Sequence, residues 1–274
     1  MIRGILMVTP EYYDVTYAIN PHMKNSDGSL KKVDKMKATR EWGELTKAFL
    51  EIGIPIKIIN GVKNLPDMVF AANQTFPLLD GSFVLSNMSN PERAEEIEYF
   101  KNFLHGEGLR YHELNFGKYS FEGMGDAIWH PKKRLVWGGH GFRTDLEAYD
   151  ILEDHFNLDI IPLKLKREEF YHLDTCLVPI DSATALFVES AFDKESLVKL
   201  QHGFENLIPI PEDEALKNFA GNAFCPDGHH VVMQSGSKKT MKLLGQLGLE
   251  VLEVETSEFI KGGGSVFCLK GMYF

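Results

Sequence analysis

Short apolar runs alternate with longer amphipathic segments along most of the chain. The apolar runs are bounded by Gly, Pro, Asn or Asp, as β-strands are, whereas the amphipathic segments of 10 to 18 residues carry apolar side chains at helical spacing. Strand and helix signals that alternate in this way predict an α/β fold.

The predicted elements recur in the order strand, strand, helix, strand. Four copies follow one another: Met68–Phe76, Ser82–Ser86, Glu92–Leu104 and Leu109–Glu113; Asp126–His130, Arg134–Trp137, Leu146–His155 and Asp159–Leu163; Thr175–Pro179, Ala185–Glu189, Lys194–His202 and Leu207–Ile210; Asn222–Cys225, His230–Gln234, Lys238–Leu247 and Glu250–Val254. A fifth copy begins with Ser265–Leu269, and only the N-terminal elements Ile2–Val8, Lys35–Ile52 and Ile56–Ile59 can complete it.

Self-similarity at roughly 50 residues is the signature of a repeat architecture. Because the last copy spans both termini, the pattern predicts one α/β-propeller domain over residues 1–274. Five ββαβ modules would form a pseudo-fivefold ring closed across the termini. A generic open α/β sheet, in which the copies are coincidences of Gly and Pro punctuation, stays open as the alternative.

Glycine-rich and polar loops add two expectations. Gly262–Gly264 precedes a predicted strand and not a helix, so it lacks the helix N-terminus of a phosphate-binding fingerprint. We interpret it as backbone that needs small residues near a site. The polar stretch 24–32 is expected to be a surface loop and a candidate lid.

The composition and charge of the chain limit the classes of molecule that it is expected to bind. Hydrophobic residues make up 44% of the 274 residues and charged residues 25%, which is ordinary globular usage. The formal charge of −10 disfavours nucleic acid and fits a small cationic ligand. The early apolar run Ile5–Val8 is far shorter than the roughly 18 residues that span a bilayer, and no cleavable signal pattern follows Met1. We therefore expect a soluble, cytoplasmic protein with no membrane partner.

Reactive or guanidinium-binding side chains stand where the first strand of each copy begins. Equivalent ends of five modules in a ring point toward one axis, so residues about 200 positions apart would meet there. A thiol works as its thiolate, a nearby His can move protons, and carboxylates bind a planar guanidinium bidentately. The set predicts a cysteine-dependent site for a cationic guanidino substrate, and it comprises Asp67, Asn73, Glu122, Asp126, His172, Asp174, Asn222 and Cys268.

Each residue also has a plainer interpretation. Cys268 lies in an apolar run and could be a small buried hydrophobe, and His172 could be an ordinary satisfied histidine. Glu122 and Asp126 could merely cap a turn. The other two cysteines, Cys176 and Cys225, are expected in the core, and the three cysteines contain no zinc-type pair.

A metal site is not predicted. Asp227 stands near the adjacent pair His229 and His230, but neighbouring residues on a strand face opposite ways, so these side chains are expected to diverge.

Four motifs resemble the pentein superfamily of guanidine-modifying enzymes, which includes arginine deiminases, dimethylarginine dimethylaminohydrolases, amidinotransferases and arginine dihydrolases of the cyanobacterial type. The motifs are Asn64-Leu65-Pro66-Asp67-Met68-Val69-Phe70-Ala71-Ala72-Asn73, Phe121-Glu122-Gly123-Met124-Gly125-Asp126, Phe170-Tyr171-His172-Leu173-Asp174-Thr175 and Gly262-Gly263-Gly264-Ser265-Val266-Phe267-Cys268. Their likeness extends over essentially the whole chain.

The resemblance implies a role for each residue. Cys268 would be the nucleophile and His172 the general acid and base, with Glu122 and Asp174 binding the guanidinium. Arg93 and Arg143 would pair with the substrate α-carboxylate, and Asp67 matches a family acidic position near the histidine.

Asn73 departs from the deiminases and dimethylarginine hydrolases, which carry aspartate there. An amide suits a neutral ureido group whose carbonyl oxygen a carboxylate would repel. The arginine dihydrolases share this asparagine, and they also resemble the chain around Asn20, which looks like a second active-site amide. The resemblance therefore implies conversion of arginine to ornithine, carbon dioxide and two ammonia.

Other functions remain open at this point. A dimethylarginine dimethylaminohydrolase or arginine deiminase would release citrulline, and a noncatalytic pentein would bind a partner surface. None of the hydrolytic alternatives requires a cofactor, and a homo-oligomer is neither predicted nor excluded. The chain ends six residues after Cys268, so we expect that any conversion of ornithine belongs to another protein.

Overall fold

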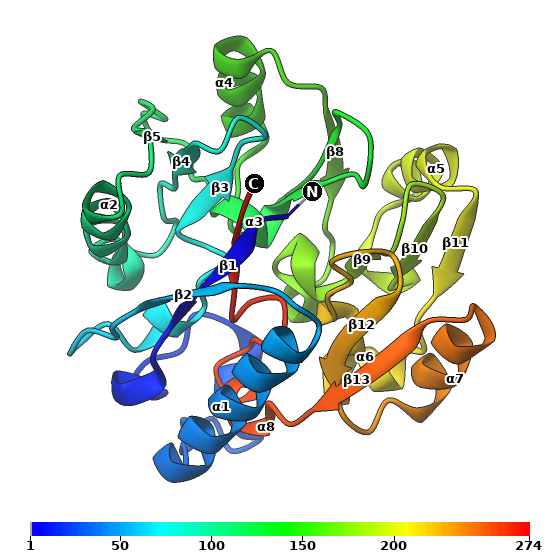
Figure 1. The fold of residues 1–274 in the computed structure, drawn as a ribbon, viewed down its shortest axis with the longest axis horizontal. Coiled ribbons are helices and arrows are strands. Elements are labelled where there is room, and N and C mark those ends of the chain that lie inside the picture. Colours follow the sequence, from blue (N-terminus) through cyan, green and yellow to red (C-terminus); the bar gives the residue numbers. More distant parts are fainter. Residues whose placement is uncertain (1) are drawn as a thin grey trace.

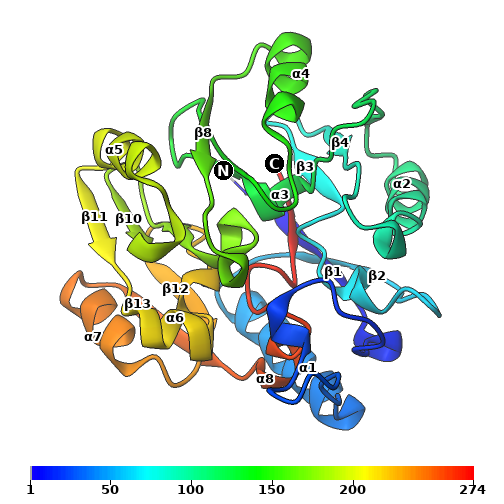
Figure 2. The same ribbon diagram turned by 180° about the vertical axis from the view of Figure 1, so that it is seen from behind.

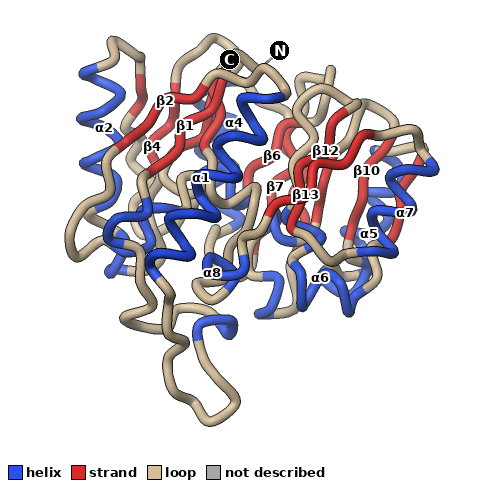
Figure 3. The backbone as a smooth tube through the Cα atoms, turned by 60° about the horizontal axis from the view of Figure 1, so that its bottom comes forward, coloured by secondary structure: helices blue, strands red, loops and turns tan. Residues whose placement is uncertain are grey.

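The computed structural model describes residues 2–274 and contains five separate β-sheets. Figure 1 shows the sheets side by side around the middle of the molecule, with α1, α2, α4, α5 and α7 on the outside. Figure 2 shows the same arrangement from behind, and Figure 3 shows the strands together with one long loop that extends beyond them.

Four of the five sheets share one internal topology, and the remaining sheet keeps its parallel pair. The three-stranded sheets are β14-β1-β2, β3-β4-β5, β6-β7-β8 and β9-β10-β11, and the fifth sheet is the pair β12-β13. In every three-stranded sheet the middle strand is antiparallel to one neighbour and parallel to the other. The pair β12-β13 is parallel, and a single antiparallel bridge from Phe224 to Val232 stands in for its missing strand.

The strand bounds follow the sequence prediction closely at most positions. The strands are β1 Gly4–Val8, β2 Ile56–Ile59, β3 Thr75–Pro77, β4 Phe83–Leu85, β5 Tyr111–His112, β6 Ala127–Trp129, β7 Val136–His140, β8 Ile160–Lys164, β9 Leu177–Pro179, β10 Thr184–Phe187, β11 Asn206–Pro209, β12 His230–Gln234, β13 Glu250–Val254 and β14 Gly271–Tyr273. Every residue of the middle strands β1 and β10 is buried, as expected for strands covered on both faces.

Helices connect the parallel strands within each sheet. The helices are α1 Lys35–Glu51, α2 Glu96–Gly106, α3 Gly123–Asp126, α4 Leu146–Phe156, α5 Lys194–Gly203, α6 Glu212–Asn218, α7 Lys238–Gln246 and α8 Ser257–Ile260. Each of the five predicted helices is present, as α1, α2, α4, α5 and α7. Asp34 and Asp193 cap α1 and α5, and each side chain accepts a hydrogen bond from a backbone N–H of the first turn.

Three predicted strands are wrong, and all three lie beside the site. Residues 66–69 form a 3-10 helix that begins at Pro66, so β3 does not begin until Thr75. Asn222 ends another 3-10 helix, Ala220–Asn222. The run Ser265–Leu269 is a turn, and the strand that follows it is β14. The short helices α3, α6 and α8 were not predicted.

The termini meet in the first sheet, where β14 pairs with β1 across 268 residues of chain. Gly4 lies opposite Tyr273, and the Arg3 amide donates to the Tyr273 carbonyl at 2.9 Å. No helix within residues 2–274 is long and apolar enough to cross a membrane.

Candidate active site

The predicted site residues come from five segments, each of which leads into one of the five sheets. Asp67 and Asn73 precede β3, Glu122 caps α3 and Asp126 ends it before β6, and His172 and Asp174 precede β9. Asn222 precedes the Phe224 bridge, and Cys268 precedes β14. Hydrogen bonds described below bring these segments together.

The thiol of Cys268 is buried between Asp174 and Asn222. Its Sγ donates to Asp174 Oδ2 at 3.1 Å and accepts from Asn222 Nδ2 at 3.1 Å. Asn222 Oδ1 also accepts from the backbone amides of Ser265 and Cys268, so this one side chain holds the whole turn in place. Burial raises the pKa of Cys268 well above its usual value, and Asp174 raises it further. The resting cysteine is therefore a thiol.

Asp174 is the acceptor for that thiol. Burial raises the pKa of Asp174 to about 7, although the thiol and Asn222 both hydrogen-bond to this residue. Its second oxygen, Oδ1, has no partner.

His172 is held as a neutral imidazole with one free nitrogen. Its Nε2 lies 2.8 Å from Glu122 Oε2, and because Glu122 is ionised, Nε2 must carry the hydrogen. Nδ1 has no partner and keeps its lone pair. Burial lowers the pKa of His172 to about 4 despite the hydrogen bond to Glu122. The ring is therefore available as a base at neutral pH.

Glu122 is the carboxylate that orients this histidine. Burial alone would raise the pKa of Glu122, but Arg143 and His172 bring it well below its usual range. Arg143 donates to Oε2 at 3.2 Å, and Ser89 donates to Oε1 through its hydroxyl at 2.6 Å. Arg143 also donates to the Ile19 carbonyl and stacks 4.7 Å from the ring centre of Tyr171.

Asn73 presents its amide N–H₂ and not its oxygen. Arg93 donates to Asn73 Oδ1 at 2.8 Å, which leaves Nδ2 as the unpartnered atom. Arg93 is buried and also donates to Glu96 and to the Asp67 carbonyl. The structure thus places Arg93 behind Asn73, with all three guanidinium nitrogens engaged by protein groups.

Several buried acceptors at the site have no residue among 2–274 at ordinary hydrogen-bonding distance, although Tyr17 lies near enough to Asp67 to oppose the rise that burial causes in the pKa of that carboxyl. They are both carboxylate oxygens of Asp67, Asp126 Oδ2 and Asp174 Oδ1. Burial raises the pKa of Asp67 and of Asp126, so a cation that enters the site would favour their ionised forms. A guanidinium has five N–H donors and a delocalised positive charge, and it matches this set of acceptors.

Asn20 lies at the edge of the site. It is half-buried, its Nδ2 donates to the Gly262 carbonyl at 3.0 Å, and its Oδ1 accepts from the His22 amide. His22 in turn contacts the Glu169 carbonyl at 2.9 Å. The segment 19–22 therefore packs over Arg143 and the glycine loop, while residues 24–32 form a mainly exposed loop beyond it.

Two glycines allow the site side chains to approach the backbone. A Cβ on Gly125 would lie 2.4 Å from Asn73 Nδ2 and 3.2 Å from the His172 ring. A Cβ on Gly264 would lie 2.5 Å from the Phe70 ring and 2.9 Å from Cys268 Cβ. The expectation that the glycine loop needs small residues is confirmed.

Sequence reasoning missed Lys270 and left Asn222 without a role. Lys270 is fully buried two residues after Cys268, and a lysine inside the apolar run 266–274 was the available signal. Cys176 is buried in the core as expected, whereas Cys225 is half-buried and packs against the core from outside.

The histidine pair differs from expectation. His229 and His230 have ring centres 4.6 Å apart and both approach Glu250, so the prediction that they diverge is wrong. His229 precedes β12 in a turn closed by Asp227, and the strand rule does not apply there. The three exposed or half-exposed side chains form a small cluster in which one potential ligand atom of each lies within 4.8 Å of the others.

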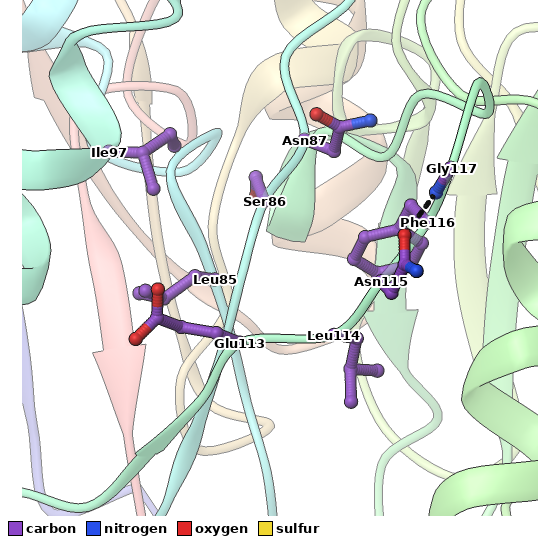
Figure 4. A pocket seen from close by; sticks show the side chains of 9 residues that line it. All are labelled: Leu85, Ser86, Asn87, Ile97, Glu113, Leu114, Asn115, Phe116 and Gly117. Atoms are coloured by element: carbon purple, nitrogen blue, oxygen red, sulfur yellow. Dashed lines mark hydrogen bonds between the residues drawn. The ribbon is translucent and has the colours of Figure 1, made fainter.

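Two surface hollows lie away from the predicted residues. Figure 4 shows one of about 220 Å³, lined by residues that include Leu85, Asn87 and Phe116. The other, of about 460 Å³, lies between α1 and β13.

Comparison with known proteins identifies the family. The family model for N,N dimethylarginine dimethylhydrolase, eukaryotic, matches residues 10–272. The chain belongs to this pentein family. It is 36% identical to the bifunctional arginine dihydrolase/ornithine cyclodeaminase AgrE of Nostoc sp., over 96% of this chain and 37% of AgrE. It is 32% identical to the N(G),N(G)-dimethylarginine dimethylaminohydrolase of Mycobacterium tuberculosis, over 97% of this chain and 84% of that protein.

The solved structures agree with this assignment. The N-terminal domain of ArgZ, covalently bound to a reaction intermediate, superposes with a TM-score of 0.91 at 33% identity and covers 98% of this chain and 97% of that one. The family member described here thus spans little more than a third of the bifunctional relatives and nearly all of the separate domain.

Proposed function

We propose that this protein is a hydrolase that converts free L-arginine to ornithine, carbon dioxide and two ammonia through a covalent Cys268 intermediate. The observation that carries the proposal is the orientation of Asn73 beside unpaired carboxylates. The carboxylate oxygens accept from a guanidinium, and the free Nδ2 donates to a ureido oxygen. The likeness to arginine dihydrolase domains supports it.

The first hydrolysis begins when the guanidinium binds among Asp67, Asp126 and Asp174. Its positive charge favours loss of the Cys268 proton, and the thiolate forms a bond to the guanidinium carbon. A neutral His172 with a free Nδ1 would take up a proton and return it to the departing ammonia; the Glu122 contact at Nε2 and the unpartnered Nδ1 support this role. Water, deprotonated by His172, then attacks the amidino-thioether and restores the thiol.

The second hydrolysis repeats this attack on the neutral ureido carbon. Asn73 Nδ2 would donate to the ureido oxygen, where a carboxylate would repel it. Loss of the second ammonia and addition of a second water leave ornithine and carbon dioxide.

Release of citrulline is the second candidate. The family model and the mycobacterial relative favour a dimethylarginine dimethylaminohydrolase, which would stop after one hydrolysis. Asn73 argues against it, because guanidinium has no acceptor for the free amide N–H₂.

We also propose that residues 1–274 act as one catalytic domain built as a closed pseudo-fivefold ring. Five sheets of matching topology, the β1–β14 pairing of the termini and contact of α1 with β13 support this arrangement. The ring would carry the five segments of the site to one centre.

The test is incubation of purified protein with isotopically labelled arginine, with ornithine, citrulline and ammonia followed over time. Two ammonia and one ornithine per arginine support the proposal, whereas citrulline alone contradicts the second step. Consumption of dimethylarginine in a parallel reaction would favour the second candidate. Cys268→Ala should bind arginine without turnover; unchanged turnover in that variant would exclude the covalent mechanism.

A further inference from the structure

Lys270 is fully enclosed, unlike every other lysine of residues 2–274. Its Nζ has no hydrogen-bond partner. The amine lies 3.2 Å from the ring centre of Phe267 and 4.1 Å from that of Phe224. Lysine is almost never fully buried without a partner, because burial of an unpaired amine destabilises the folded state. We therefore ask what function this lysine has.

The two aromatic rings that contact the amine belong to the segments that carry and hold the nucleophile. Phe267 immediately precedes Cys268, and Phe224 follows by two residues the Asn222 side chain that donates to the Cys268 sulfur. The faces of both rings favour a positive charge at this point.

The charge of the amine is coupled to that of the thiol and its acceptor. Burial lowers the pKa of Lys270 well below its usual value, whereas Asp174 and Cys268 raise it. These are the titratable groups that act on the amine, one from the 3-10 helix Leu173–Thr175 and one from its own turn. Reciprocally, Lys270 lowers the pKa of Asp174. The amine therefore gains a proton most readily when Cys268 loses one.

The two hydrolyses differ in the charge of the bound ligand. A guanidinium brings a positive charge to the thiolate during the first attack, but a ureido group is neutral. In the second attack the thiolate thus lacks the substrate cation, while Asp174 still lies 3.1 Å from the sulfur.

We propose that Lys270 supplies the positive charge that stabilises the Cys268 thiolate during the second hydrolysis, when the ligand is the neutral ureido intermediate. The inference rests on the proposed function. The S–H bond of Cys268 breaks, and by net transfer its proton is taken up by the Lys270 nitrogen, so that the site holds a thiolate and an ammonium. Lys270 acts through Cys268: its positive charge stabilises the thiolate, and it makes no bond to the substrate.

The test compares Lys270→Met with the unsubstituted protein on two substrates, arginine and citrulline. Removal of the ammonium should slow conversion of citrulline to ornithine by about ten- to a hundredfold, the effect of one close charge pair in a buried site. Conversion of arginine to citrulline should fall by a smaller factor, so citrulline accumulates. Equal losses on both substrates, or none, would overturn the role of Lys270.

A second measurement distinguishes loss of the Lys270 charge from loss of the packing of its side chain. The pH dependence of iodoacetamide alkylation is followed on the Cys268 peptide by mass spectrometry. Its midpoint should move to higher pH in Lys270→Met, and an unchanged midpoint contradicts the inference. Lys239→Met, which removes an exposed lysine paired with Asp213, is the matched control.

Folding and function can be told apart. If Lys270→Met lacks the circular-dichroism spectrum of the folded protein, Lys270→Gln is assayed, and full ornithine production by that variant overturns the inference. Unsubstituted protein that yields only citrulline from arginine contradicts the proposed function itself. Unsubstituted protein that yields ornithine, beside a variant with the same rate on citrulline, contradicts only the role of Lys270.

Discussion

At the scale of single residues, the site is defined by which atom of each polar side chain is left free. Arg93 engages the oxygen of Asn73 and leaves its nitrogen, while Glu122 engages Nε2 of His172 and leaves Nδ1. Sequence motifs name these residues but not their free atoms, because orientation depends on partners such as Glu96 and Ser89 that lie outside the four motifs.

Asn73→Asp should shift the product from ornithine toward citrulline. The carboxylate would accept from guanidinium and repel the ureido oxygen, so the second hydrolysis should slow by at least about tenfold. Product ratios from labelled arginine measure this directly. Asn102→Asp on the exposed face of α2 is the control, and an unaltered ornithine yield in Asn73→Asp would contradict the role of the amide.

Asp174→Asn should stabilise the fold while it impairs catalysis. Burial raises the pKa of Asp174 to about 7, above its value in the unfolded chain, so the folded protein binds more protons between about pH 4 and 7. Stability from this group is present below pH 4 and is lost as the pH rises through 7. The gain in melting temperature of Asp174→Asn over the unsubstituted protein should therefore be larger at pH 8 than at pH 5.

The exposed Asp80 provides a control in which the change of stability with pH is expected to have the opposite sign. Hydrogen bonds from Ser82 lower the pKa of Asp80, so Asp80→Asn should lose more stability at pH 8 than at pH 3. A pH-independent difference for Asp174→Asn would show that its carboxyl is not preferentially protonated in the folded state.

At the scale of elements, the helices and the strands that they connect were predictable, whereas the segments that carry the site residues were not. Helical periodicity located α1 and α5 to within one residue at each end. The stretch 265–269 is apolar enough for a strand, but the Asn222 side chain binds two of its backbone amides and holds it as a turn. Such a long-range contact between side chain and backbone has no periodic signal.

Gly125→Ala in α3 should reduce activity without unfolding the protein. The new Cβ would overlap the Asn73 amide and crowd the His172 ring, so kcat/KM for arginine should fall by about tenfold or more. Steady-state assays and thermal melts separate the two effects. Gly43→Ala in α1 has open space around it and should instead raise stability by about 0.5–1 kcal/mol with activity unchanged.

At the scale of the whole molecule, four three-stranded sheets share one topology, a fifth keeps only the parallel pair, and the first is completed by both ends of the chain. The repeat in the sequence predicted that both ends of the chain would share one sheet. The fifth copy has only its first element at the C-terminus, and its other three elements stand at the N-terminus. The position of the candidate site residues ahead of each sheet was also predictable. Lys270 was not, because nothing in the repeat distinguishes a buried lysine from an exposed one.

A circular permutant tests the closure. Joining residue 274 to residue 2 through a short Gly/Ser linker and opening the exposed turn between Lys132 and Lys133 should preserve the fold and the arginine activity. Opening the chain between Gly263 and Gly264 should abolish activity, since that loop carries Cys268. Loss of folding in the first permutant would contradict the predicted tolerance.

The pairing of β1 with β14 also determines when activity can appear during folding. Cys268 is held by Asn222 on one side, and its carbonyl accepts from the Ala72 amide on the other. The strand that follows, β14, must pair with β1, whose Gly4 lies 269 positions before Tyr273 (273 − 4). Contacts between such distant parts of a chain form late, because closing a long loop costs entropy before any contact repays it. In a refolding experiment, helical signal should therefore return first, and turnover of arginine should return only in the slowest phase.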